Sequence, residues 1–194
     1  QLNPKAGTVK STIDNIIIIL DNDPLLKGKF ALNQFAGRGE VLGKLPWSMD
    51  GERRLWSDTD SNGLYWYLEK AYDITGRGNI DAALDIHAAT HAFNEVQDYI
   101  KKLVWDGIPR LDTLFIDYLG AEDDPVGYTR AVCRKAFTAA VARAMDPGCK
   151  YDCMLILCGA QGLGKSTILD KMSRGWFNDS IRTFEGKEAS ELLQ

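Results

Sequence analysis

The residues best suited to chemistry form one short run, Gly159-Ala-Gln-Gly-Leu-Gly-Lys-Ser166, which fully matches the pattern G-x-x-x-x-G-K-[ST]. Its glycines carry no Cβ, so the backbone can curl with its N–H groups facing a phosphate. Lys165 supplies a positive charge for the β- and γ-phosphates, and the Ser166 hydroxyl is the expected Mg²⁺ ligand. The spacing predicts a site for ATP and Mg²⁺, with Lys165 as the catalytic residue. The expected nucleotide-binding residues are Gly159, Ala160, Gln161, Gly162, Leu163, Gly164, Lys165, Ser166 and Thr167.

The flanking sequence is suited to hold such a loop. Upstream, the apolar run Cys153–Cys158 is typical of a buried parallel strand. Downstream, Ile168, Leu169 and Met172 fall on one face of a helix. Strand, loop and helix in this order place an anion site at a helix N-terminus.

Hydrolysis needs more than this loop, namely an acid on another strand to hold Mg²⁺ and a group that orients water. Glu185, Glu188 and Glu191 follow the loop, but their surroundings resemble a loop entering a helix. The sequence ends at Gln194 without a cap, so we expect a piece of a longer protein. Residues 1–194 alone are then expected to bind ATP weakly and to hydrolyse it negligibly, although the intact protein would be an ATPase.

The remaining chain predicts a mainly helical α+β protein. Its expected elements are a helix over 8–20 that opens near Thr8 or Ser11, a strand or hairpin over 29–42, and helices over 58–72, 79–91, from 94, over 111–119 and over 125–145. We therefore expect a small N-terminal α/β segment (1–57), a helical bundle-like domain (58–147) and the beginning of a truncated P-loop NTPase core (148–194).

Composition and charge narrow the class of protein. At 45% hydrophobic and 26% charged residues, the chain is ordinary for a soluble globular protein. The longest apolar run is too short to span a bilayer, which favours a cytoplasmic protein with no membrane partner. Residues 58–124 carry 5 Lys or Arg against 14 Asp or Glu, which is no general nucleic-acid footprint. Any contact with DNA or a protein partner would need a local patch, and the candidates are Arg130, Arg134 and Lys135; a solvated helix face fits them equally well.

Three other groups could bind metals. Cys149, Cys153 and Cys158 have the wrong spacing for a zinc site, which favours small buried thiols. The pair Asp21 and Asp23 precedes Pro24 and two leucines, which favours a turn over a calcium loop. His87 and His91 stand four apart on a helix and could share a metal. The sequence between them lacks the Glu of the zinc-protease motif, which favours a structural or exposed pair.

Several stretches resemble the virulence-associated protein E family of phage and prophage ATPases. They are Val104-Trp-Asp-Gly-Ile-Pro-Arg-Leu-Asp112, Tyr118-Leu-Gly-Ala-Glu122, Arg130-Ala-Val-Cys-Arg-Lys-Ala136, Asp146-Pro-Gly-Cys-Lys150, the loop itself and Gly175-Trp-Phe-Asn-Asp-Ser180, together with residues 30–47.

The resemblance implies a helicase-like P-loop ATPase, similar to the motor half of phage primase–helicases. Such a protein would couple ATP hydrolysis to single-stranded DNA during replication of mobile DNA, and it could assemble as a homo-oligomeric ring. The Mg²⁺-binding acid and the arginine that completes a neighbouring site are expected beyond residue 194. Two alternatives stay open: a P-loop kinase for a small molecule, and a non-enzymatic DNA or protein interaction module with a vestigial loop.

Overall fold

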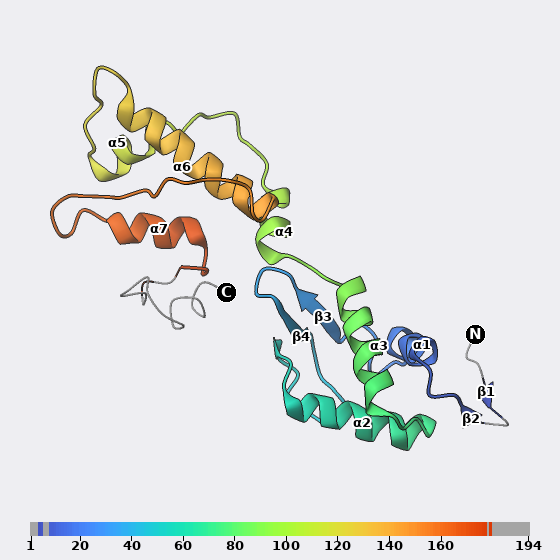
Figure 1. The fold of residues 1–194 in the computed structure, drawn as a ribbon. Coiled ribbons are helices and arrows are strands. Elements are labelled where there is room, and N and C mark those ends of the chain that lie inside the picture. The colour runs from blue at the N-terminus through green and yellow to red at the C-terminus, as the bar shows by residue number, and fades with distance from the viewer. Residues whose placement is uncertain (1–3, 6–7, 178, 180–194) are drawn as a thin grey trace. The chain divides into compact units, whose positions relative to one another are not determined.

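The computed structural model describes residues 4–5, 8–177 and 179, which form a mixed α+β and mainly helical fold (Figure 1). They divide into two compact units that meet between Glu95 and Val96. The first unit holds β1 (Pro4–Lys5), β2 (Thr8–Val9), α1 (Ile13–Asn22), β3 (Phe30–Asn33), β4 (Arg38–Val41), β5 (Arg54–Leu55), α2 (Asp58–Tyr72) and α3 (Arg77–Thr90). The second holds α4 (Glu95–Lys102, whose first residue belongs to the first unit), α5 (Leu114–Leu119), α6 (Tyr128–Met145) and α7 (Lys165–Ser173).

The predicted hairpin is confirmed and forms the centre of a three-stranded antiparallel sheet in the order β3-β4-β5. Phe30 pairs with Val41, and both side chains are buried. A second, smaller antiparallel pair joins β1 to β2.

Helix α1 begins at Ile13, close to the later of its two predicted starts, Thr8 and Ser11, because Thr12 is its N-cap and accepts a hydrogen bond from the Asn15 N–H at 3.4 Å. Its buried face carries Ile16, Ile19 and Leu20. In Figure 1, α1 and α3 lie side by side, and α3 packs against β3.

Helices α2 and α3 share one hydrophobic core with α1 and the sheet. Leu64 and Leu68 of α2 and Ile80 of α3 are fully or almost fully buried beside Ile16 and Phe30. The unit boundary therefore differs from the domain boundary expected at residues 57/58. The helical period of residues 58–90 identifies an apolar face but does not say which element covers it.

A buried carboxylate, that of Asp60, organises the start of α2. Its two oxygens accept hydrogen bonds from Arg54 Nη1 and Nη2 at 2.5 and 2.6 Å and from Trp47 Nε1 at 3.1 Å. Ser57 donates to the same carboxylate from both its backbone N–H (3.0 Å) and its hydroxyl (2.6 Å). The backbone bond is the Asp60 half of a capping box at the start of α2. Burial would raise the pKa of Asp60, but these bonds outweigh it and hold the pKa below its usual value.

The outer edge of β3 is partly covered by the segment that follows α3. Phe93 donates its N–H to Leu32 O at 3.0 Å and accepts from Gln34 N–H at 2.9 Å. The Arg53 guanidinium lies 4.8 Å from the centre of the Phe93 ring and also pairs with Glu95 at 3.1 Å. Phe93 is thus fixed by its backbone on one side and by its ring on the other.

In the second unit, α5 and α6 pack through Phe115 and Phe137, whose ring centroids are 5.7 Å apart. Helix α6 starts three residues after the predicted start, because the Asp124 carboxylate accepts the N–H groups of Tyr128 and Thr129, each at 2.9 Å. The Cys133 thiol is buried and donates to Leu111 O at 2.9 Å.

The predicted strand at residues 153–158 is wrong: residues 151–160 have no regular secondary structure, and Met154 and Ile156 are exposed. A buried parallel strand needs a paired neighbour on its edges. Among residues 4–5, 8–177 and 179, no strand pairs with this segment. No helix in the described part of the chain is long and apolar enough to cross a membrane.

Candidate nucleotide-binding site

The glycine-rich loop leads directly into helix α7. Gly164 is the N-cap of this helix, and its carbonyl accepts the Ile168 N–H at 2.9 Å. Gly162 and Gly164 have φ values of +88° and +82°, a left-handed conformation that side chains rarely adopt. The two glycines therefore allow the sharp turn that aims the first N–H groups of α7 at the loop.

Lys165, the first residue of α7, folds back over the loop. Its ammonium donates to Gly159 O at 3.0 Å and to Ala160 O at 2.7 Å. Ser166 and Thr167 follow on the exposed part of the first turn. The structure thus brings the predicted residues 159–167 together around one helix N-terminus, where the helix dipole favours an anion.

A pocket of about 390 Å³ adjoins this N-terminus, between α5 and α7. Its lining is mainly apolar with two cationic side chains, Arg110 and Lys171. Arg110 is held by Asp106 Oδ2 at 2.8 Å, and this ion pair lowers the pKa of Asp106 to about 2. The lining residues are Arg110, Leu114, Tyr118, Leu119, Gly164, Thr167, Ile168, Lys171 and Met172.

Sequence reasoning did not assign Arg110 or Tyr118 to the site. Both lie in stretches that carry the family resemblance, but nothing in their spacing connects them with a loop some 40 residues away. Only the folded structure, in which both residues line one pocket with residues of α7, reveals this connection.

The cysteines near the loop differ from the expected buried thiols. Cys153 and Cys158 are exposed and Cys149 is half-buried, and all three are free thiols. The prediction of burial depended on the strand at 153–158, which is not formed. Glu185, Glu188 and Glu191 lie outside the described residues.

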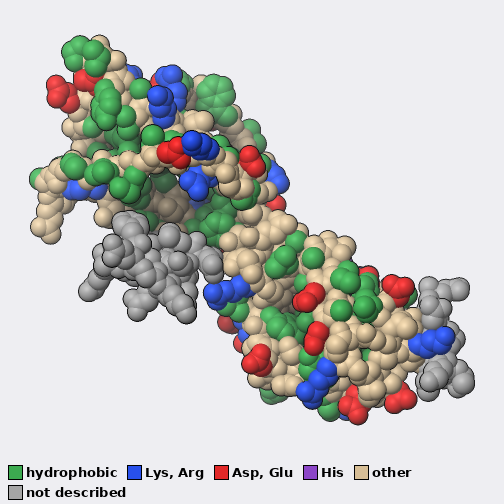
Figure 2. Space-filling view, viewed as in Figure 1, with side chains coloured by type: hydrophobic (Ala, Val, Ile, Leu, Met, Phe, Trp, Pro, Cys, Tyr) green, Lys and Arg blue, Asp and Glu red, His purple; other side chains and the backbone are tan. Residues whose placement is uncertain are grey.

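The candidate DNA-contact arginines on α6 are already paired with carboxylates. Arg130 Nη2 lies 2.5 Å from Asp123, and Arg134 forms a two-pronged ion pair with Asp112. Lys135 is exposed on the same helix. On the face seen in Figure 2, basic and acidic side chains are interspersed within each unit, so a local carboxylate reduces the positive charge that either arginine offers to a phosphate.

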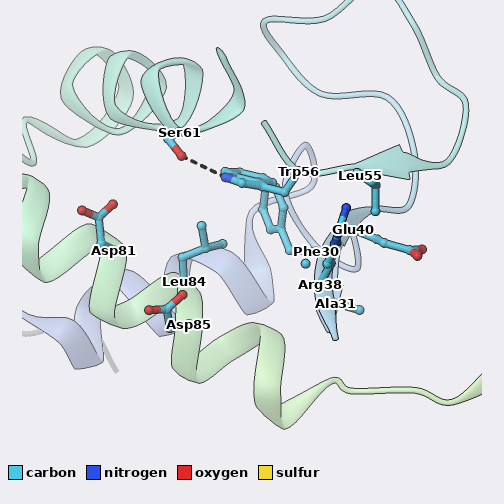
Figure 3. A pocket seen from close by; sticks show the side chains of 11 residues that line it. Phe30, Ala31, Arg38, Glu40, Leu55, Trp56, Ser61, Asp81, Leu84 and Asp85 are labelled. Carbon is cyan, nitrogen blue, oxygen red and sulfur yellow. Dashed lines mark hydrogen bonds between the residues drawn. The ribbon is translucent and has the colours of Figure 1, made fainter. Parts of the chain in front are cut away.

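The first unit holds another pocket, of about 490 Å³, beside the sheet (Figure 3). In its lining, the indole N–H of Trp56 donates to Ser61 Oγ at 2.9 Å, and the Asp81 carboxylate accepts from the Tyr65 hydroxyl. Glu40, also in the lining, accepts from Asn33 and Arg53. These polar groups are engaged within the protein, and Arg38 and Asp85 are the other charged residues of the lining.

Comparison with known proteins supports the family resemblance over residues 100–194, just under half of the chain. Residues 100–194 match the model of the virulence-associated protein E-like domain, and this range includes the whole glycine-rich loop. The match does not include residues 30–47. No curated protein matches the chain. Residues 100–194 of this chain therefore belong to the virulence-associated protein E-like domain family.

Proposed function

We propose that this chain provides the ATP–Mg²⁺-binding loop of a helicase-like ATPase that acts on single-stranded DNA in the replication of phage or other mobile DNA. The observation that carries the proposal is the geometry of residues 159–166, a complete phosphate-binding motif that turns at Gly164 into the N-terminus of α7. Membership of residues 100–194 in the virulence-associated protein E-like family supports it.

The position of Lys165 suggests how the loop exchanges internal contacts for phosphate. Two backbone carbonyls, those of Gly159 and Ala160, hold the ammonium over the loop. Phosphate oxygens carry full negative charge, so they accept from an ammonium more strongly than neutral carbonyls do. Lys165 can therefore move to the β- and γ-phosphates, while the Ser166 hydroxyl becomes available to Mg²⁺.

The DNA-binding part of the proposal depends on α6. Lys135 is exposed, whereas Arg130 and Arg134 would have to leave Asp123 and Asp112 before contacting a phosphate backbone. A DNA phosphate could compete for these arginines because it offers the same two-pronged acceptor geometry as a carboxylate.

The first experiment measures Mg²⁺–ATP binding by wild type and Lys165→Ala. Removing a charge-assisted hydrogen-bond donor costs about 1.5–3 kcal/mol, or roughly a tenfold to hundredfold loss of affinity. Lys102→Ala is the matched control, because it deletes the same charge from an exposed position on α4. Equal affinities for wild type and Lys165→Ala would contradict the proposed site.

The second experiment measures ATP turnover by the intact protein, with and without single-stranded DNA. Stimulation by DNA supports the helicase-like function. Turnover that ignores DNA but requires a small phosphate acceptor would favour a P-loop kinase. DNA binding without nucleotide binding would favour an interaction module with a vestigial loop.

A further inference from the structure

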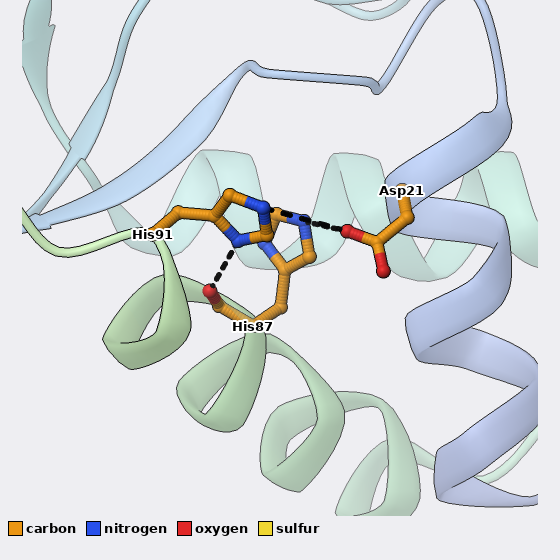
Figure 4. A group of neighbouring side chains, drawn as sticks. All are labelled: Asp21, His87 and His91. Carbon is orange, nitrogen blue, oxygen red and sulfur yellow. Dashed lines mark hydrogen bonds and ion pairs between the residues drawn. The ribbon is translucent and has the colours of Figure 1, made fainter.

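Three side chains with metal-binding atoms meet between α1 and α3 in the first unit (Figure 4). Asp21 comes from the last turn of α1, His87 from the last turn of α3, and His91 from the C-cap of α3. One potential ligand atom from each lies within 4.8 Å of the others. We propose that Asp21, His87 and His91 bind one late first-row divalent metal ion, and that Zn²⁺ fits them best.

The distances suit a single ion. Asp21 Oδ1 lies 3.1 Å from His87 Nε2 and 3.7 Å from His91 Nε2. Ligand atoms of a tetrahedral Zn²⁺ with bonds of about 2.0–2.1 Å are roughly 3.4 Å apart. The two distances from Asp21 lie on either side of this value, and all three ligand atoms lie within 4.8 Å of one another, so side-chain rotations would complete the geometry.

The two imidazoles present the same nitrogen to the carboxylate. Their rings are stacked, with centroids 4.3 Å apart and planes 30° apart, and Figure 4 shows both rings turned towards Asp21. His91 Nδ1 lies 2.9 Å from the His87 carbonyl, so in the neutral ring Nδ1 is the donor and Nε2 carries the lone pair. A backbone carbonyl that fixes the tautomer in this way is a common partner of metal-binding histidines.

A hydrogen bond between Asp21 and His87 explains only part of this arrangement. It accounts for the 3.1 Å contact, but His91 Nε2 at 3.7 Å is too distant to donate to the same oxygen. The His87 ring is buried, and its Nδ1 has no hydrogen-bond partner. Its polar interaction is therefore directed entirely at the point where the other two side chains converge.

The electrostatic surroundings also favour a cation. Asp21 and His87 each lie at the C-terminal end of a helix, where the helix dipole is negative. Neither α1 nor α3 has a Lys or Arg in its last turn. Burial of His87, together with the neighbouring His91, lowers the pKa of His87 and so favours the neutral ring that metals require.

The chemistry of the ligands selects the ion. Two imidazole nitrogens and one carboxylate oxygen suit Zn²⁺ and its first-row neighbours better than Ca²⁺ or Mg²⁺, which prefer oxygen. The side chains of His91 and Asp21 are 47% and 40% exposed, so a water molecule or an exogenous ligand can occupy the fourth position. Three protein ligands with an open fourth position are typical of a zinc site that can act on a substrate.

The test is a calorimetric titration of the full chain with Zn²⁺. The free thiols must first be removed by Cys149→Ser, Cys153→Ser and Cys158→Ser, because exposed thiols bind zinc themselves. In this background we expect one Zn²⁺ per chain. Asp21→Asn and His91→Gln should each weaken binding by at least about tenfold. Asp85→Asn, which removes an exposed charge from α3, the helix that carries His87, should leave the affinity unchanged.

A second readout separates metal binding from a structural role. Co²⁺ in place of Zn²⁺ should give the visible absorption of a tetrahedral site in the parent protein, and His91→Gln should abolish it. If the cluster has only a structural role, Asp21→Asn lowers the melting temperature equally with and without Zn²⁺. Absence of Zn²⁺ binding, or equal binding by the parent, Asp21→Asn and His91→Gln, would overturn the proposal.

Discussion

Replacing Asp60 with Asn should destabilise the first unit strongly while conserving side-chain volume. The Asp60 side chain is fully buried, whereas that of Arg54 is 31% exposed. Each Asp60 oxygen accepts at least two hydrogen bonds, so an amide NH₂ at either position would face donors from Arg54, Ser57 or Trp47. Removing one partner of a buried ion pair costs about 3–5 kcal/mol, and the partial exposure of Arg54 lowers our expectation to about 3 kcal/mol.

The assay is urea unfolding followed by tryptophan fluorescence and far-ultraviolet circular dichroism. With a slope of about 1–3 kcal/mol per molar urea, a loss of this size lowers the midpoint by about 1 M or more. Asp58→Asn is the matched control, because it removes an exposed carboxylate from the first turn of the same helix. Its cost should stay within about 0.3–1 kcal/mol, the typical contribution of a charge near a helix N-terminus.

The same variant should change the pH dependence of stability. The pKa of Asp60 is lower in the folded protein than in the unfolded chain, where it is about 3.9. Its contribution is therefore complete above the unfolded-state pKa and decreases as the pH falls through and below that value. Asp60→Asn should flatten this acid limb. A variant no less stable than Asp58→Asn, with an unchanged acid limb, would refute the assigned role of Asp60.

Two further outcomes are expected in the first unit. Gly63→Ala should destabilise it by about 1–3 kcal/mol in urea unfolding, because the added Cβ would lie 2.3 Å from Trp47 Cγ. Gly78→Ala, which meets no atom within 4 Å near the start of α3, should be neutral or stabilising; equal effects of the two substitutions would contradict the packing. Burial and a hydrogen bond to Asp23 raise the pKa of Tyr67 to about 12, so its stabilising effect should be complete below pH 10 and disappear as the pH rises through its folded pKa. Ultraviolet titration of Tyr67→Phe beside wild type checks this value, and loss of a phenol that ionises near pH 10 would contradict it.

Local sequence signals predicted most of the secondary structure. The hairpin over 29–42 and the helix over 58–72 follow from short-range alternation, helical periodicity and caps, and both are found. The glycine-rich loop is also a local signal, because its conformation depends on residues close together in the sequence, such as Gly162 and Gly164. The strand at 153–158 was not found, since strand formation depends on a partner that an apolar run alone does not supply.

Contacts between distant residues could not be predicted from the sequence. The spacing of His87 and His91 places them on one face of α3, but only the packing of α1 against α3 brings Asp21 to them. Likewise, the spacing of Arg130 and Arg134 predicts a shared basic face, whereas the structure pairs each with an aspartate. Periodicity specifies a face of a helix and carries no information about its partner.

The attachment of Phe93 to β3 has a consequence for solubility. An uncovered sheet edge presents free N–H and C=O groups that can add a strand from another molecule, which is a common start of aggregation. Here the backbone of Phe93 occupies part of that edge, and the Arg53 guanidinium covers its ring. Shortening the first unit to end before Phe93 would uncover the edge at Leu32 and Gln34. Such a shortened chain should self-associate through β3 even if its core stays folded.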